Sequence, residues 1–187
     1  MRVLRARGNA RNRETFKDLI FTGPRLKVCY SGCRWNTVVF AVDDNQTEFE
    51  DWLYKVFQAL EDSVKADPSS FKVNPRNHPT FSQFIIQPSS NPDLYAPELR
   101  TRLATRRPDP MSEPVNAACL LDATTQIKVD PTSIKSGSFM RPVFKLGYYK
   151  EGDNFGLTLT VLKAECEPNP QEEMSYDDLE MDVDQGV

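Results

Sequence analysis

The chain of 187 residues is long enough for one domain with its own hydrophobic core and additional terminal segments. Hydrophobic residues make up 39% and charged residues 27%, as in soluble globular proteins, and no apolar run approaches the roughly 20 residues of a membrane-spanning helix. The N-terminus lacks the apolar segment of a secretory signal, and four scattered cysteines do not suggest a disulfide framework. The sequence therefore predicts an intracellular protein of the cytoplasm, nucleus or nucleoid, with no membrane association.

Charge is divided between the two ends of the chain. Nine of the first 36 residues are basic and two are acidic. From Gln171 to Val187 there is no basic residue, and seven residues are acidic: Glu172, Glu173, Asp177, Asp178, Glu180, Asp182 and Asp184. Without these seven, 23 basic side chains face 20 acidic ones, so the remainder of the chain carries +3. This separation of charge is the first functional indication.

Residue patterns divide the chain into three parts. Residues 1–15 are rich in Arg and Asn without periodicity, and we expect a flexible basic arm. Residues 16–168 form the predicted domain, which begins with strand-like runs at 17–22, 26–30 and 35–42. Residues 169–187 form the acidic tail, which we expect to be disordered.

A long helix is predicted from Glu48 to Lys65. Its apolar residues recur at steps of three and four, which places one continuous stripe against a core. Thr47 and Glu50 have the spacing of a capping box, and Pro68 ends the helix because it disfavours helical geometry at the residue before it.

After the helix, the periodicity weakens and proline becomes frequent. Short strands are expected at 71–73 and 81–87, and the Pro-rich stretch 88–114 is predicted to be a loop. The last third is β: residues 117–121 could pair with 125–129, and residues 142–149 and 154–163 form a hairpin around a turn at 150–153. Alternating apolar residues from Phe155 to Val161 indicate a strand with one buried face.

Together these elements predict a mainly β protein, an OB-fold-like Greek-key barrel of about five or more strands with one major α-helix. A β-sandwich is the alternative. In the simplest barrel assignment, the helix lies between the third and fourth strands.

Side chains suited to catalysis are scarce. His78 is the single histidine and has a loop context, which nearly excludes a Ser–His–Asp triad or a multi-histidine metal site. Cys29 and Cys33 have the spacing of a zinc knuckle, but without a second close pair we expect ordinary cysteines. No Gly-rich phosphate loop is present. The sequence therefore predicts no enzyme, no cofactor and no metal.

Basic residues lie beside aromatic residues at several places. Proteins that bind single strands use cations to contact phosphates and flat rings to stack bases. Core packing is the alternative for each ring, and Trp35, Phe139 and one of Tyr148 and Tyr149 are the favoured stacking candidates. The predicted nucleic-acid-binding residues are Arg34, Trp35, Phe71, Lys72, Arg76, Arg100, Arg102, Arg106, Arg107, Phe139, Arg141, Lys145, Tyr148, Tyr149 and Lys150.

The stretch from Ile134 to Glu165, followed by the acidic tail, resembles the closing part of single-stranded DNA-binding proteins from phages and large DNA viruses. A Gly-Ser turn at 137–138, a basic-aromatic strand with Lys145, Tyr148 and Tyr149, a hairpin and an alternating strand occur in the order of that family. The resemblance implies an OB-fold that protects single strands in replication, recombination or repair. It also implies an acidic tail that recruits replication proteins, and it allows a homodimer. Independently, a polyanion tethered beside a basic groove competes with nucleic acid for that groove, so the tail is expected to autoinhibit binding.

We therefore expect sequence-independent binding of single-stranded DNA that weakens as salt rises. Single-stranded RNA is an alternative ligand, because stacking and phosphate contacts serve both nucleic acids. A different class of function is a protein-interaction or virion structural module, which would use residues 88–114 and the acidic tail as contact surfaces.

Overall fold

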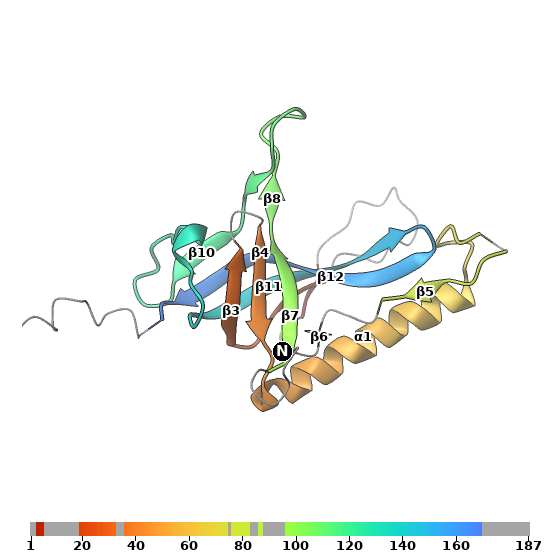
Figure 1. The fold of residues 1–187 in the computed structure, drawn as a ribbon, viewed down its shortest axis with the longest axis horizontal. Coiled ribbons are helices and arrows are strands. Elements are labelled where there is room, and N and C mark those ends of the chain that lie inside the picture. The colour runs from red at the N-terminus through yellow and green to blue at the C-terminus, as the bar shows by residue number, and fades with distance from the viewer. Residues whose placement is uncertain are drawn as a thin grey trace, which may run out of the picture.

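The computed structural model describes residues 3–5, 19–32, 36–74, 76–82, 86–87 and 96–169. Within these residues the protein is mainly β, with one long helix beside a sheet of ten strands (Figure 1). The first strands are β1 (Val3–Arg5), β2 (Leu19–Thr22), β3 (Leu26–Gly32), β4 (Thr37–Ala41), β5 (Thr80–Phe81) and β6 (Ile86–Gln87). The later strands are β7 (Glu98–Leu103), β8 (Thr105–Arg106), β9 (Val115–Asn116), β10 (Cys119–Asp122), β11 (Phe139–Glu151) and β12 (Asn154–Glu167).

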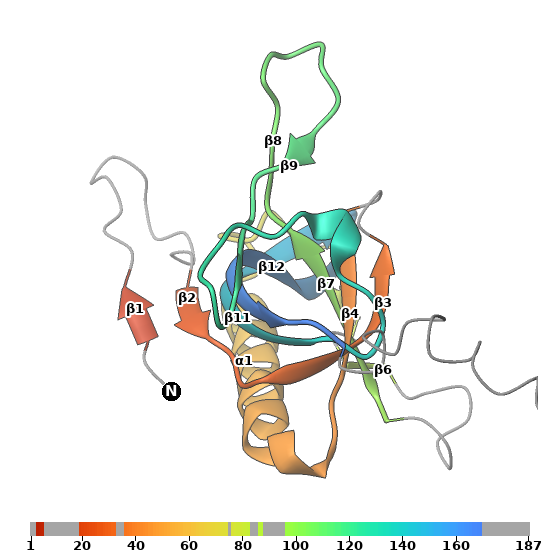
Figure 2. The same ribbon diagram turned by 90° about the vertical axis from the view of Figure 1, so that its left-hand side faces the viewer.

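Five of these strands close into a barrel in the order β3-β4-β7-β12-β11, because β11 pairs with both β12 and β3. Strands β3, β4 and β7 form an antiparallel meander, β7 runs parallel to β12, and β12 is antiparallel to β11. In chain order this is the strand arrangement 1-2-3-5-4 of an OB-type Greek-key barrel. The predicted fold class is confirmed, and Figure 2 shows the ring of strands.

The helix α1 (Thr47–Ala66) extends the predicted helix by one residue at each end. It follows β4, so it lies between the second and third barrel strands, and its predicted position between the third and fourth is wrong. The predicted capping box is also wrong, because a short 3₁₀ helix, η2 (Asp44–Gln46), precedes α1 and carries the box on Asp43 and Gln46. The Thr47 hydroxyl instead donates to the Asp44 carbonyl at 2.8 Å.

Aromatic side chains dominate the core between the barrel and α1. Phe144 of β11 is fully buried. The centroid of its ring lies 5.5 Å from that of Phe21, 6.2 Å from that of Phe40 and 6.3 Å from that of Phe49 on the helix. Phe49 and the other buried residues of α1 belong to the apolar stripe read from the sequence. Burying such side chains contributes about 1.5–3 kcal/mol each, which fixes the helix against the sheet.

The Pro-rich stretch contains the largest error of the sequence-based assignment, since the third barrel strand, β7, lies inside it. Residues 98–103 alternate between outward positions and the buried Leu99, Thr101 and Leu103, which is the period of a strand. The hydroxyl of Thr101 donates to the Val38 carbonyl at 2.9 Å, so this buried polar group is satisfied. Residues 88–95 lie outside the described part of the chain.

Two other predicted β segments differ from the structure. Residues 71–73, predicted to be a strand, form a turn in which Lys72 has a φ of 57°. The predicted pairing of 117–121 with 125–129 reduces to a single bridge between Leu121 and Lys128, and β10 pairs in parallel with β12 instead. A 3₁₀ turn, η3 (Pro131–Ser133), follows this segment.

The predicted hairpin near the C-terminus is confirmed and is longer than expected, because β11 and β12 have 13 and 14 residues. Its far end reaches beyond the barrel and is supported by β5, which pairs with Asn154 and Phe155 (Figure 1). Apart from β1, residues 1–15 lie outside the described residues, as does the acidic tail from residue 170.

Candidate nucleic-acid interface

One face of the barrel carries exposed cations beside an exposed ring. Strands β3, β4 and β7 lie side by side, and their pairing aligns Tyr30 with Val39 and Val39 with Arg100. The next row places Thr37 against Arg102. Arg100 and Arg102 alternate with buried residues of β7, so both side chains lie on the outside of the barrel. We call this surface, with Lys27, Tyr30, Val39, Arg100 and Arg102, the outer face.

The outer face has more basic than acidic side chains, and its basic side chains are only weakly paired. Arg100 is 60% exposed and makes a long ion pair of 3.7 Å with Glu98 of its own strand. An exposed pair of this length contributes at most about 1 kcal/mol, so a phosphate group can displace it. Tyr30 is 57% exposed, which is more than any other aromatic residue in the described part of the chain.

The outer face continues onto β12 and β11. Arg102 aligns with Thr160, and Thr160 aligns with Lys145, so a row of polar side chains crosses three strands. Further along β11, Tyr149 lies on the same side as Lys145 and its ring covers Gly156, where an added Cβ would lie 2.4 Å from the ring. Tyr149 is thus supported from below and 36% exposed, which leaves it available to a base.

At its C-terminal end, β7 leads into a short ribbon of β8 and β9 that projects from the barrel (Figure 1). The exposed Arg106 lies on β8 and Arg107 follows it. At a rise of about 3.3 Å per residue, the cations from Arg100 to Arg106 extend over about 20 Å. Arg100, Arg102 and Arg106 therefore form a track that leaves the barrel along the ribbon.

Asn36, the first described residue after β3, lies at the same end of the outer face. The backbone N–H of Leu103 donates to the Asn36 carbonyl at 2.8 Å, which fixes the end of the loop between β3 and β4 beside β7. Arg34 and Trp35 belong to the loop but lie outside the described residues. In OB-folds this loop and the loop between the last two barrel strands border the face that binds oligonucleotides.

Other predicted binding residues lie at the far end of the β11–β12 hairpin and have structural contacts. Phe71 packs against Tyr148 and Phe155, with ring centroids 6.0 and 6.1 Å away. The ammonium group of Lys150 donates to the Lys72 carbonyl at 2.6 Å. Of the two neighbouring tyrosines, Tyr148 is therefore the one that packs into an aromatic cluster, with Phe71 and Phe155. The exposed Arg76 lies in the turn before β5, away from the outer face.

Phe139 and Arg141 lie around the barrel on β11. The guanidinium of Arg25 lies 3.5 Å from the centroid of the Phe139 ring and pairs with Glu167 at 2.6 Å. This hydrogen-bonded pair lowers the pKa of Glu167, with a smaller contribution from the nearby Arg141. Since Arg25 covers the ring, Phe139 is not presented for stacking as the sequence predicted.

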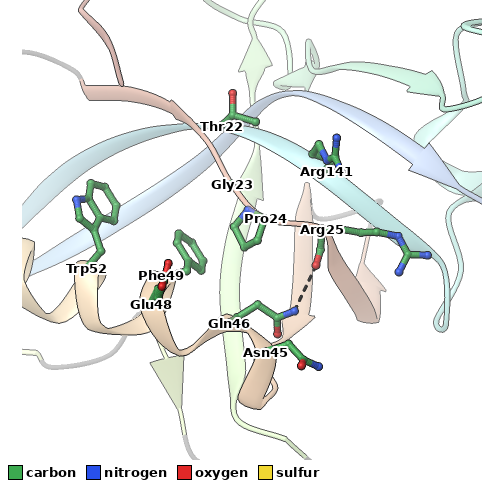
Figure 3. Close-up of a pocket in the computed structure, with 10 residues that line it drawn as sticks. All are labelled: Thr22, Gly23, Pro24, Arg25, Asn45, Gln46, Glu48, Phe49, Trp52 and Arg141. Atoms are coloured by element: carbon green, nitrogen blue, oxygen red, sulfur yellow. Dashed lines mark hydrogen bonds between the residues drawn. The ribbon is translucent and has the colours of Figure 1, made fainter. Parts of the chain in front are cut away.

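Arg25 and Arg141 also line a pocket of about 660 Å³ at the start of α1. Figure 3 shows Trp52 and Phe49 on one side of it, Pro24 between, and the two arginines on the other side. The Gln46 amide donates to the Arg25 carbonyl at 3.4 Å and holds η2 against the segment that joins β2 to β3.

Tyr30 and Lys27 were not among the predicted binding residues, and for Tyr30 the reason is a β-bulge. The register of β3 against β4 shifts between Val28 and Tyr30, so Cys29 is an extra residue. Counting alternate positions from the buried Leu26 and Val28 assigns Tyr30 to the core, whereas the bulge moves it to the outer face. The available sequence signal was weak: Tyr30 lies two residues before Gly32, close to the expected turn.

In the described part of the chain, no group of three or more His, Cys, Asp or Glu side chains could hold a metal ion. Cys29 is half-buried, and its burial, followed by the nearby Glu98 carboxylate, raises the pKa of the thiol. Cys33, the other cysteine of the predicted zinc-knuckle spacing, lies outside the described residues. No helix in the same residues is long and apolar enough to cross a membrane.

No family model matches the sequence, and no curated protein is significantly similar to it. The fold is similar to the crystal structure of gp2.5, a single-stranded DNA binding protein encoded by bacteriophage T7, with a TM-score of 0.56 and 13% sequence identity. The similarity covers 89% of this chain and 98% of gp2.5. At this identity the similarity establishes a shared fold over nearly the whole of both chains.

Proposed function

We propose that this protein binds single-stranded DNA without sequence preference and acts in DNA replication, recombination or repair. The observation that carries the proposal is the outer face, where Arg100 and Arg102 of the third barrel strand and the exposed Tyr30 of the first strand lie on the same side of an OB-type barrel, across the second strand. In OB-folds this surface binds oligonucleotides. The fold shared with a phage protein of that function supports the same conclusion.

The chemistry of the outer face explains why binding would not depend on sequence. Guanidinium groups contact phosphates, which every nucleotide has, and a tyrosine ring stacks on any base. Lys145 and Tyr149 would continue these contacts along the hairpin, and Arg106 along the ribbon.

The acidic tail would regulate this binding. Eighteen residues follow the last described residue, Asn169, and seven of them are acidic. A tethered polyanion reaches millimolar effective concentration near its own domain, so the tail would compete with DNA for the cations of the outer face. The same tail would be available for recruiting replication proteins when DNA displaces it.

The test is a fluorescence titration of oligo-dT of about 16 nucleotides at several salt concentrations. The chain lacking residues 170–187 should bind more tightly than the full chain. Arg100→Ala with Arg102→Ala should weaken binding and reduce the slope of log affinity against log salt by about 1.4, since each phosphate contact contributes about 0.7. The matched control removes two exposed cations of α1, Lys55→Ala with Lys65→Ala, and should change neither quantity.

Two results would contradict the proposal. One is the absence of oligo-dT binding at low salt by the tail-deleted chain. The other is an equal loss of affinity in the control pair and in the arginine pair, which would mean that net charge alone governs binding. A parallel titration with oligo-U decides whether RNA is bound equally well.

A further inference from the structure

The ribbon of β8 and β9 ends in a tip, residues 107–114, that stands clear of the barrel in both views (Figures 1 and 2). Met111 lies in this tip with 95% of its surface exposed. A methionine side chain is flexible and polarizable, so one with almost no contact to its own chain is suited to filling a pocket of a partner.

The tip is held in one conformation. The carboxylate of Asp109 accepts hydrogen bonds from the backbone N–H of Met111 and of Ser112, both at 2.9 Å, and from the Ser112 hydroxyl. These bonds lower the pKa of Asp109. Prolines at 108, 110 and 114 restrict the backbone further. Met111 is therefore presented at little entropic cost to binding.

The pocket at the start of α1 has the complementary features. Its apolar wall contains Trp52, Phe49 and Pro24, and methionine sulfur packs favourably against aromatic rings. Its other wall contains Arg141, which makes no ion pair within 4.0 Å to any described residue. Two residues beyond Met111, Glu113 is likewise unpaired among the described residues. A tip seated with Met111 against the rings can bring Glu113 to Arg141.

The tip and the pocket cannot meet within one molecule. The ribbon projects from one end, and the start of α1 lies at the opposite end in both views (Figures 1 and 2). We infer that the Met111 tip of one copy occupies the Trp52–Arg141 pocket of the next copy. Because the two surfaces differ and lie at opposite ends, the contact is head-to-tail and generates an open row of molecules.

This inference extends the proposed function, and rests on it for its main consequence. The cations from Arg100 to Arg106 run along β7 toward the ribbon, that is, toward the next copy in the row. Successive outer faces would then follow one DNA strand, and binding to long single strands would be cooperative.

The experiment compares affinity per binding site for oligo-dT of about 16 and of about 60 nucleotides. We expect the wild-type chain to bind the long oligonucleotide about tenfold more tightly per site. Met111→Glu, at the tip, and Asn45→Trp, which fills the pocket, should each abolish this gain and leave affinity for the short oligonucleotide unchanged. Ile127→Glu, a change at an apolar residue that is 67% exposed elsewhere, is the matched control and should keep the gain.

A mixture of the two variants sharpens the test. The Asn45→Trp protein keeps an intact tip and the Met111→Glu protein an intact pocket, so the mixture should form pairs and recover part of the gain that neither variant has alone.

Three results would overturn the inference: no gain in the wild-type chain, a gain that survives in either variant, or a loss of affinity for the short oligonucleotide in Met111→Glu, which would make the tip a DNA contact. If the wild-type chain binds neither oligonucleotide, the proposed function fails. Sedimentation of concentrated protein without DNA then tests the contact between copies. The inference requires that the wild-type chain self-associates and that neither variant does.

Discussion

The outer face and the far end of the β11–β12 hairpin both combine aromatic and basic residues, but they use them differently. At the hairpin end the rings contact one another, as in Phe81 and Phe155 with centroids 5.9 Å apart, and the Lys150 ammonium lies 5.8 Å from the Phe155 ring. On the outer face, Tyr30 makes no ring contact with any described residue. A base can stack on an aromatic ring only where the protein leaves a face of that ring uncovered. A basic residue next to the ring in the sequence does not show whether the face is uncovered.

The largest expected effect tests the structural role of the hairpin end. Phe155→Ala should lower the free energy of unfolding by about 3–5 kcal/mol, because a fully buried ring leaves a cavity. Urea denaturation measures this change. Phe155→Leu is the conservative control and should cost less. The affinity of the folded fraction for oligo-dT should be unchanged, and a selective loss of affinity would place this end in the binding site.

The next effect tests the outer face. Tyr30→Ala should weaken oligo-dT binding by about 1–3 kcal/mol, the contribution of one stacked base, while Tyr30→Phe should retain most of it. Tyr54 is 49% exposed on α1 and provides a matched control, so Tyr54→Ala should bind like the wild-type chain. Equal effects at Tyr30 and Tyr54 would remove the distinction between the two regions.

A smaller effect concerns the acidic residue on the outer face. Glu98→Gln should strengthen binding a few-fold, since it releases Arg100 from its ion pair and removes a negative charge beside the track. Titrations at low salt measure the gain, which should disappear as salt is raised. Asp62→Gln, on α1, removes the same charge away from the face and should have no effect.

The smallest expected effect concerns the stability of the protein in acid, and it involves neither the outer face nor the hairpin end. Asp122 accepts hydrogen bonds from the N–H groups of Thr125 and Thr124 and from the Thr125 hydroxyl, and these bonds lower its pKa. Its stabilising contribution is thus present above the unfolded pKa of about 3.9 and is lost as pH falls through the lower folded value. Asp122→Asn should unfold with a shallower dependence on pH below 4 in thermal melts, and an unchanged dependence would contradict this assignment.

Much of the fold was predictable because its strongest patterns are local. The apolar stripe of α1 and the alternation from Phe155 to Val161 each report one buried face, and both elements occur where they were expected. Strand β7 was not recognised, because prolines on both sides of it obscured six alternating residues whose partners in β4 are about 60 positions earlier.

The candidate site was less predictable than the fold. Arg100 and Arg102 were predicted from a cluster of basic residues and Lys145 from its aromatic neighbours, and the barrel aligns Arg102 with Lys145 through Thr160. Phe71 and Phe139 were indistinguishable from exposed rings in the sequence, because the residues that cover them, Tyr148 and Arg25, are distant along the chain. Contacts of this kind are set by tertiary packing, which single-residue patterns do not contain.

The extra residue in β3 has a consequence for how this surface could change over time. Without Cys29, Tyr30 would follow the buried Val28 directly and still face outward, so deleting that codon would preserve the ring. Deleting the codon of Tyr30 instead would bring Cys29 to the outward position opposite Val39. At this bulge, a change of one residue in strand length can therefore keep or remove the outward ring without shifting the rest of the strand.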